Sequence, residues 1–144
     1  MLSVSRSRLV TVPPTRVWEA YVDFDSWLAW VPHFREVVPL SDGPLAQGYR
    51  ARIRERFSVV PRVWEVTEFE PGRSFAWRGS LAPGLRLTVD HVATPEAPGT
   101  LATLTLRVEG PLAPLVAPVA FALTARTFER SLAALAERLE GTGA

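Results

Sequence analysis

LAPLVAPVAFALTARTFERSLAALAERLE, residues 112–140, is the stretch of sequence that decides the fold. Its apolar residues recur at the 3.6-residue period of a helix with one buried face. That face carries Ala117, Phe121, Thr124, Ala125, Phe128, Leu132, Leu135 and Leu139. The pattern predicts a long C-terminal helix from about Leu112 to Glu140 whose apolar face meets a sheet.

A second apolar stripe covers only the first half of this helix. Its members are Leu112, Leu115, Val116, Val119 and Leu123. In order of preference, we interpret the stripe as a contact with two short helices predicted near the N-terminus, as the lid or mouth of a cavity, or as a subunit interface. Residues 110–125 carry no charge, but they are fewer than the ~20 that a bilayer requires and contain three prolines. We therefore expect a buried helix start and no membrane insertion.

The chain before this helix is typical of an antiparallel meander. Residues 3–12 predict a strand, and residues 15–23 and 25–31 predict two short helices. From Phe34 onward, strand-like runs alternate with turn signals at residues 41–44, 61, 71–72, 83–84 and 95–99. Two short helices cannot bury one face of a seven-stranded sheet, so the long helix must lie across it. The expected fold class is α+β.

The clearest strand is YRARIRERF, residues 49–57, in which every second residue is arginine. We interpret the arginines as a solvated, ion-paired sheet face and not as a nucleic-acid footprint. If the next strand returns through a turn near residues 58–61, Arg54 lies opposite Glu65, and Glu55 lies opposite Trp64.

Composition excludes several classes of function. The 144 residues predict one domain, residues 1–144, and a net charge of +1 offers no field for a polyanion such as nucleic acid. Without cysteine and with only two histidines, the chain offers no disulfide and no thiolate, and we expect neither a metal nor a cofactor. The N-terminus lacks a signal-peptide pattern, so we expect a cytoplasmic protein.

The order of these elements and several short motifs together resemble a known family. The motifs are VPPTRVWEAYVD at residues 12–23, WVPHF at residues 30–34, Gly48 before a strand, Pro71 after one, and Gly110-Pro111-Leu112 before the long helix. They resemble the polyketide cyclase/dehydrase-like branch of the START-related superfamily. The resemblance implies a helix-grip fold, in which a curved antiparallel sheet wraps around the long helix and encloses an apolar cavity. Relatives use that cavity for lipids, polyketides, hormones or other apolar molecules, and they share no universal catalytic residue that could be carried over to this chain.

Strand alternation and the helix stripe predict which side chains line this cavity. The candidate ligand-binding residues are Trp30, Phe34, Ile53, Glu55, Phe57, Trp64, Phe75, Trp77, Val89, His91, Leu106, Ala117, Phe121, Thr124 and Phe128. Most are large and apolar, and each could equally well pack a core.

Two polar candidates need separate explanations. An ionised Glu55 facing inward needs a partner, and Arg62, His91, trapped water or a ligand hydroxyl could serve. The alternative is a side chain at the sheet rim that reaches water or pairs with Arg62. His91 is either satisfied by a backbone carbonyl or by Thr103, or it lines the pocket as a proton donor or acceptor. We expect His33 to be exposed, with the cavity mouth as the alternative place.

Three functions remain open from the sequence. The first is the binding, and possible transport, of a small apolar or amphipathic molecule by a monomer or homodimer. The second is a polyketide cyclase or dehydratase that uses Glu55 and His91 as an acid/base pair. The third is a protein-interaction module that uses the apolar first half of the long helix.

Overall fold

The computed structural model describes residues 2–56 and 60–142 of the chain. It contains seven strands, a long helix and a group of short helices near the N-terminus. In chain order the elements are β1 (Leu2–Val10), α1 (Pro14–Val22), η1 (Phe24–Ser26), α2 (Trp27–Trp30), β2 (Phe34–Pro39), β3 (Arg50–Glu55), β4 (Arg62–Glu70), β5 (Ser74–Ala82), β6 (Leu85–Glu96), β7 (Gly99–Glu109) and α3 (Ala113–Thr142). The predicted strand, short helices, meander and long helix are all confirmed.

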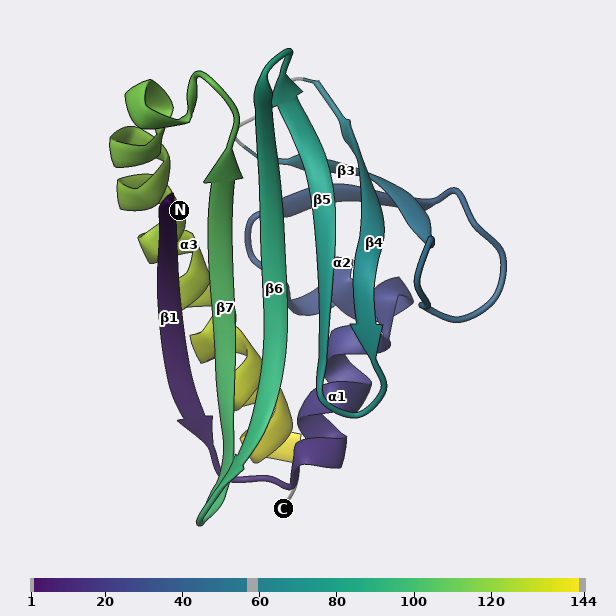
Figure 1. Cartoon of the computed structure of the whole chain (residues 1–144). Helices are drawn as coiled ribbons and strands as arrows, with labels where there is room; N and C mark the ends of the chain where they lie inside the picture. Colours follow the sequence, from purple (N-terminus) through teal and green to yellow (C-terminus); the bar gives the residue numbers. More distant parts are fainter. Residues whose placement is uncertain (1, 57–59, 143–144) are drawn as a thin grey trace.

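The strands form one antiparallel sheet in the order β1-β7-β6-β5-β4-β3-β2. The helices all lie on one face of this sheet, where α3 runs along β1 and β7, and α1 and α2 cover the neighbouring part (Figure 1). Inward side chains of strand and helix meet there, so this is the face on which the core forms. The sheet grips the long helix as the sequence predicts.

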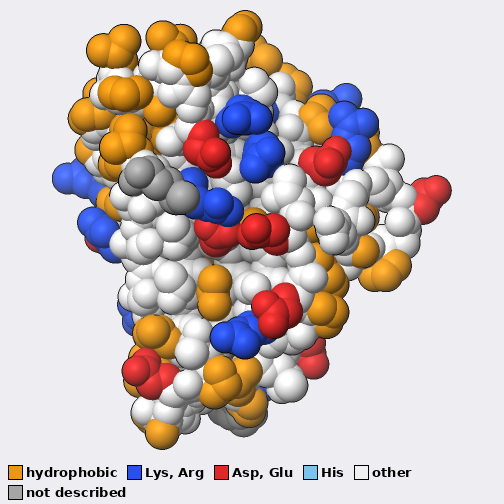
Figure 2. All heavy atoms as spheres, viewed as in Figure 1, with side chains coloured by type: hydrophobic (Ala, Val, Ile, Leu, Met, Phe, Trp, Pro, Cys, Tyr) orange, Lys and Arg blue, Asp and Glu red, His pale blue; other side chains and the backbone are white. Residues whose placement is uncertain are grey.

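The long helix is buried in its second half and largely exposed in its first. Leu132 and Leu135 retain 2% and 1% of their surface, whereas Leu115 retains 78% and Val119 66%. Figure 2 shows the resulting apolar area, which gathers over the beginning of α3. The preferred interpretation of the second stripe, a contact with the two short helices, is therefore wrong for these residues, because they face solvent. Within the described residues, no helix is long and apolar enough to span a membrane.

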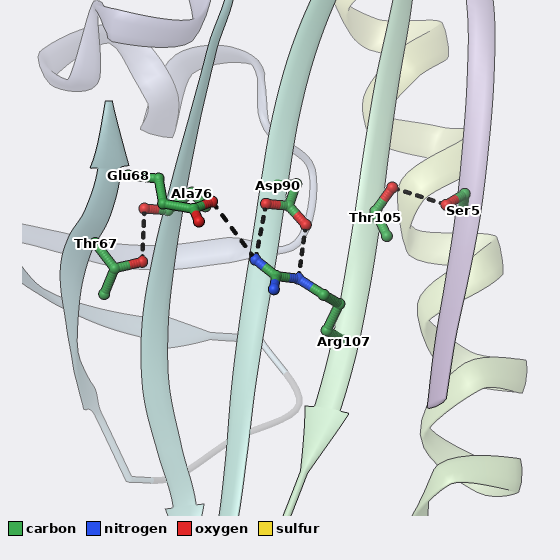
Figure 3. A network of polar contacts seen from close by, with 7 residues as sticks. All are labelled: Ser5, Thr67, Glu68, Ala76, Asp90, Thr105 and Arg107. Carbon is green, nitrogen blue, oxygen red and sulfur yellow. Dashed lines mark hydrogen bonds and ion pairs between the residues drawn. The ribbon is translucent and has the colours of Figure 1, made fainter. Parts of the chain in front are cut away.

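The opposite face of the sheet is polar and held by cross-strand pairs (Figure 3). Arg107 donates two hydrogen bonds to Asp90, at 2.9 and 3.1 Å, and its guanidinium lies 3.7 Å from Glu68. The hydroxyls of Ser5 and Thr105 are 2.7 Å apart. Because these polar side chains alternate with the buried ones along each strand, they fix which face meets the helices.

The predicted register between β3 and β4 is wrong by four residues. Glu65 lies opposite Arg50, and Trp64 lies opposite Ala51, not opposite Arg54 and Glu55. The ladder begins at Arg62, because Pro61 before it has no backbone N–H to donate. Since four is an even number, the shift leaves every side chain on its predicted face.

The arginine stripe is ion-paired as predicted at its first two positions. Arg50 lies 3.7 Å from Glu65, and Arg52 lies 3.8 Å from Glu36. All four of these side chains are about half exposed. Such exposed pairs contribute little to stability.

Candidate functional site

Aromatic rings fill the part of the inner face that lies under the short helices. Trp27 is at the centre of this group, 3% exposed, and its indole N–H donates to the carbonyl of Ala20 at 3.2 Å. Its ring centroid lies between 5.0 and 6.4 Å from those of Phe24, Phe34, Phe75, Trp77 and His91. These contacts anchor the one-turn helix α2 on the sheet, since edge-to-face and stacked ring pairs stabilise beyond their buried area.

His91 belongs to this aromatic group. Its ring stacks on Phe75, with centroids 4.3 Å apart and planes 6° apart. Burial lowers the pKa of His91 to about 3, and the backbone of Phe75 and Val89 offsets part of that effect. The imidazole is therefore neutral at ordinary pH. Its Nδ1 is buried and has no hydrogen-bond partner in the described part of the chain.

Glu55 is held by an arginine near the end of β3. Arg62 donates to its Oε2 at 3.0 Å, and the two side chains are only 11% and 20% exposed. Burial raises the pKa of Glu55, and the charge and hydrogen bond of Arg62 oppose that rise. Of the partners considered for Glu55, the structure selects Arg62. No hydrogen bond or ion pair between described residues joins Glu55 to His91, and β4 and β5 lie between their strands.

The middle of β6 remains partly accessible although it lies in the interior of the sheet on the helix-covered face. Leu87, Val89 and His91 are successive inward positions of this strand, and all three are only half-buried. The inward residues at its two ends, Leu85 and Ala93, are 3% and 1% exposed. Along β6 the accessible surface is therefore confined to the middle of the strand, where a ligand could contact it.

A glycine shapes the same region. Gly79 on β5 lies opposite Leu87 on β6. A Cβ added to Gly79 would stand 3.0 Å from the indole ring of Trp64. The missing side chain lets the indole lie directly against the backbone of β5. The Nε1 of Trp64 and that of Trp30 are buried without a partner among the described residues. His91 Nδ1 is buried without a partner in the same way.

The long helix contributes the other side of the region. Ala117 and Phe128 are buried, at 2% and 6% exposure, whereas Phe121 and Thr124 on the same stripe are half-buried. The partly accessible positions of α3 thus lie in its first half, as do its exposed leucines. The helix packs tightly where Phe128 begins its second half and more loosely before it.

A polar pocket of about 300 Å³ opens next to this region. It is lined by Pro32, His33, Arg56, Thr127 and Arg130, which come from the α2–β2 connection, the end of β3 and α3. The expectation that His33 is exposed is wrong: it is half-buried, because Ser131 lies 3.3 Å from its Nδ1. His33 instead lines the pocket together with Arg56 and Arg130. A second hollow, of about 500 Å³, lies at the end of β6 between residues 11–13 and 95–99.

Many of the candidate residues lie together in the core. Phe34, Ile53, Trp64, Phe75, Trp77 and Leu106 all join the apolar core on the inner face. Phe57 lies outside the described residues. Sequence reasoning missed Trp27, Tyr21 and Phe24, which contact the candidate rings directly. Trp27 precedes the candidate Trp30 by three residues, but a helix of four residues is too short for its sequence to show which of the two tryptophans faces the sheet.

These features define a helix-grip protein with an aromatic interior, a partly accessible inner sheet face and a basic pocket that includes Arg56 and Arg130. Among the described residues, no group of three or more histidine, aspartate or glutamate side chains is placed to hold a metal ion. The family model described as polyketide cyclase / dehydrase and lipid transport matches residues 1–140. The chain belongs to that family.

Solved structures agree with this fold. A START superfamily protein from Mycobacterium smegmatis has a TM-score of 0.75 at 19% identity and covers 99% of both chains. The Zhui aromatase/cyclase from Streptomyces sp. R1128 has a TM-score of 0.74 at 20% identity, covering 96% of this chain and 93% of its own. A protein from Thermus thermophilus reaches 0.78 at 19% identity, with 99% of both chains covered. At these identities the similarity concerns the fold alone, and no curated protein sequence matches the chain.

Proposed function

We propose that this chain binds a small hydrophobic or amphipathic molecule between the centre of its sheet and the first half of α3. The observation that carries the proposal is the partial accessibility of Leu87, Val89 and His91 on the helix-covered face. Apolar side chains that stay accessible inside a fold are a surface that a ligand can cover, at about 25 cal/mol per Å². The description of the family, which includes lipid transport, supports the same class of ligand.

The buried nitrogen atoms indicate which polar groups the ligand carries. Trp30 Nε1, Trp64 Nε1 and His91 Nδ1 have no partner among the described residues, and each such buried group costs about 1–3 kcal/mol. Carbonyl or hydroxyl oxygens of a bound molecule would accept from the two indole N–H groups. A largely apolar ligand with one or two oxygen atoms therefore suits the interior better than a pure hydrocarbon.

Binding is favoured over acid/base catalysis by the state of the two candidate catalytic groups. A general acid or base works best with a pKa near the operating pH, whereas burial lowers the pKa of His91 to about 3. Glu55 is engaged by Arg62 at 3.0 Å. Neither group is poised for proton transfer, and the two are not paired with each other.

Filling the accessible region tests the proposal. Val89→Trp adds a large ring at the half-buried inner position of β6, and it should weaken binding of N-phenyl-1-naphthylamine about tenfold or more. Binding is measured by the rise in fluorescence of this neutral aromatic probe as it leaves water. Thermal unfolding followed by circular dichroism checks that the variant is folded.

The matched control is Val63→Trp, because Val63 is 39% exposed on the outer face of β4. This variant should bind the probe like the unmodified protein. Equal affinities of the two folded variants, or an unmodified protein that binds no probe, would contradict binding on the inner face.

A further inference from the structure

We infer that the bound molecule carries an anionic group, which Arg56 and Arg130 hold at the mouth of the interior while its apolar part lies inside. The inference rests on the proposed function and assigns the class of ligand, an amphipathic anion such as a carboxylate, phosphate or sulfonate ester of an apolar body. It follows from the pocket lined by Pro32, His33, Arg56, Thr127 and Arg130.

Three segments that are far apart in the sequence build this pocket. Arg56 directly follows β3, and its backbone N–H donates to the carbonyl of His33 at 2.9 Å. Arg130 lies on α3, next to Ser131, which contacts the ring of His33. His33 thus ties the end of the sheet to the helix, and both guanidinium groups flank one pocket.

The charge of the pocket is uncompensated. Its lining includes no carboxylate, and neither Arg56 nor Arg130 forms an ion pair within residues 2–56 and 60–142. Several arginines elsewhere are paired, for example Arg6 with Glu129 and Arg62 with Glu55. Two unpaired guanidinium groups beside one pocket form an attractive site for an anion, since each can donate hydrogen bonds in a fixed fork.

His33 adds a neutral donor to the same pocket. Burial lowers its pKa to about 4, so the ring is uncharged at neutral pH. If Ser131 donates to Nδ1, the ring proton stays on Nε2, and this N–H is available for an anionic oxygen. A neutral imidazole beside two arginines avoids the repulsion that a third positive charge would add.

The pocket adjoins the apolar interior through a chain of ring contacts. His33 and Phe34 have centroids 4.4 Å apart, and Phe34 stacks on Trp27 at 5.6 Å. Trp27 in turn contacts Trp77 and His91. A ligand whose charged end lies against Arg56 and Arg130 would therefore have its apolar body beside the first of these rings.

Two probes with the same aromatic skeleton test the inference. N-phenyl-1-naphthylamine is neutral, and 1-anilinonaphthalene-8-sulfonate differs from it by one sulfonate group. The unmodified protein should bind the sulfonate about tenfold more tightly than the neutral probe, the effect of about one charge-assisted hydrogen bond. The double variant Arg56→Gln/Arg130→Gln should lose this preference while its affinity for the neutral probe stays the same. Affinities come from fluorescence titrations at fixed ionic strength.

The control is Arg73→Gln/Arg86→Gln, which removes the same net charge from exposed positions at other places on the surface. It should keep the preference for the sulfonate.

If the neutral probe binds but the preference is unchanged in Arg56→Gln/Arg130→Gln, the anion site is wrong and the proposed function stands. If inorganic phosphate alone at millimolar concentration displaces the sulfonate probe, the site belongs to a free anion, and the amphipathic assignment is overturned. If neither probe binds, the proposed function itself fails.

Discussion

Replacing Arg62 with methionine is expected to lower the free energy of unfolding by about 3 kcal/mol at neutral pH. The variant leaves Glu55 as a carboxylate that is only 11% exposed and has lost its ion pair. Methionine keeps most of the volume of the arginine stem, so the loss comes from the uncompensated charge and not from a cavity. Urea unfolding followed by circular dichroism measures the difference.

The pH dependence of this loss has a defined sign. Burial already raises the pKa of Glu55 above its ordinary value of 4.5, and removing Arg62 raises it further. The folded state of the variant then binds a proton more tightly than the unfolded state over a wider pH range. The cost is full above the raised pKa and shrinks as the pH falls toward the ordinary value, so the loss should be larger at pH 8 than at pH 5.

A matched substitution tests whether the loss of stability depends on the burial of the ion pair. Arg50→Met removes the partner of Glu65, but both side chains of that pair are more than half exposed, and the cost should stay below about 1 kcal/mol. Glu55→Gln/Arg62→Met should recover part of the stability, because the buried charge is gone. A loss of the same size in Arg50→Met, or a loss in Arg62→Met that does not change with pH, would contradict this description of Glu55.

The second large effect on the free energy of unfolding is expected in the buried half of α3. Leu135→Ala should cost about 2–5 kcal/mol, because the side chain is 1% exposed and packs in the core. Leu115→Ala on the same helix should change stability by less than about 0.5 kcal/mol, since Leu115 is 78% exposed. Both are measured by urea unfolding of the same protein preparation, with analytical ultracentrifugation to determine its oligomeric state.

The pair also tests how the exposed stripe behaves in solution. If Leu115→Ala costs as much as Leu135→Ala, the first half of α3 is covered in solution, and the interface interpretation of the stripe would replace the solvent-exposed one.

The fold could be predicted from sequence because its periodic signals are strong. The stripe that includes Leu132 and Leu135 defined the long helix, and the arginine alternation in β3 defined a strand with one wet face. Alternation gives the face of each residue but not its partner. This is why the inward direction of Glu55 was predicted correctly, whereas the register between β3 and β4 was wrong.

The site was predictable only in part, for a different reason. Inward residues of long strands, such as Trp77 and Val89, follow from alternation, but a helix of one turn carries no period that distinguishes Trp27 from Trp30. The basic pocket joins Arg56 to Arg130, which no local pattern connects. Such a site depends on how the end of β3 meets α3, and only the three-dimensional structure shows that.

The most direct measurement of ligand binding on the inner face uses the indole N–H signals of the five tryptophans. Nitrogen-15-labelled protein is titrated with N-phenyl-1-naphthylamine, and each signal is assigned with a Trp→Phe variant. The signals of Trp30 and Trp64 should shift together and saturate at one probe per chain, because their Nε1 atoms are buried without a partner among the described residues. Trp18, which lies on α1 against Phe69, should not shift. Saturable binding that leaves Trp30 and Trp64 unmoved would contradict a ligand site between the sheet and α3.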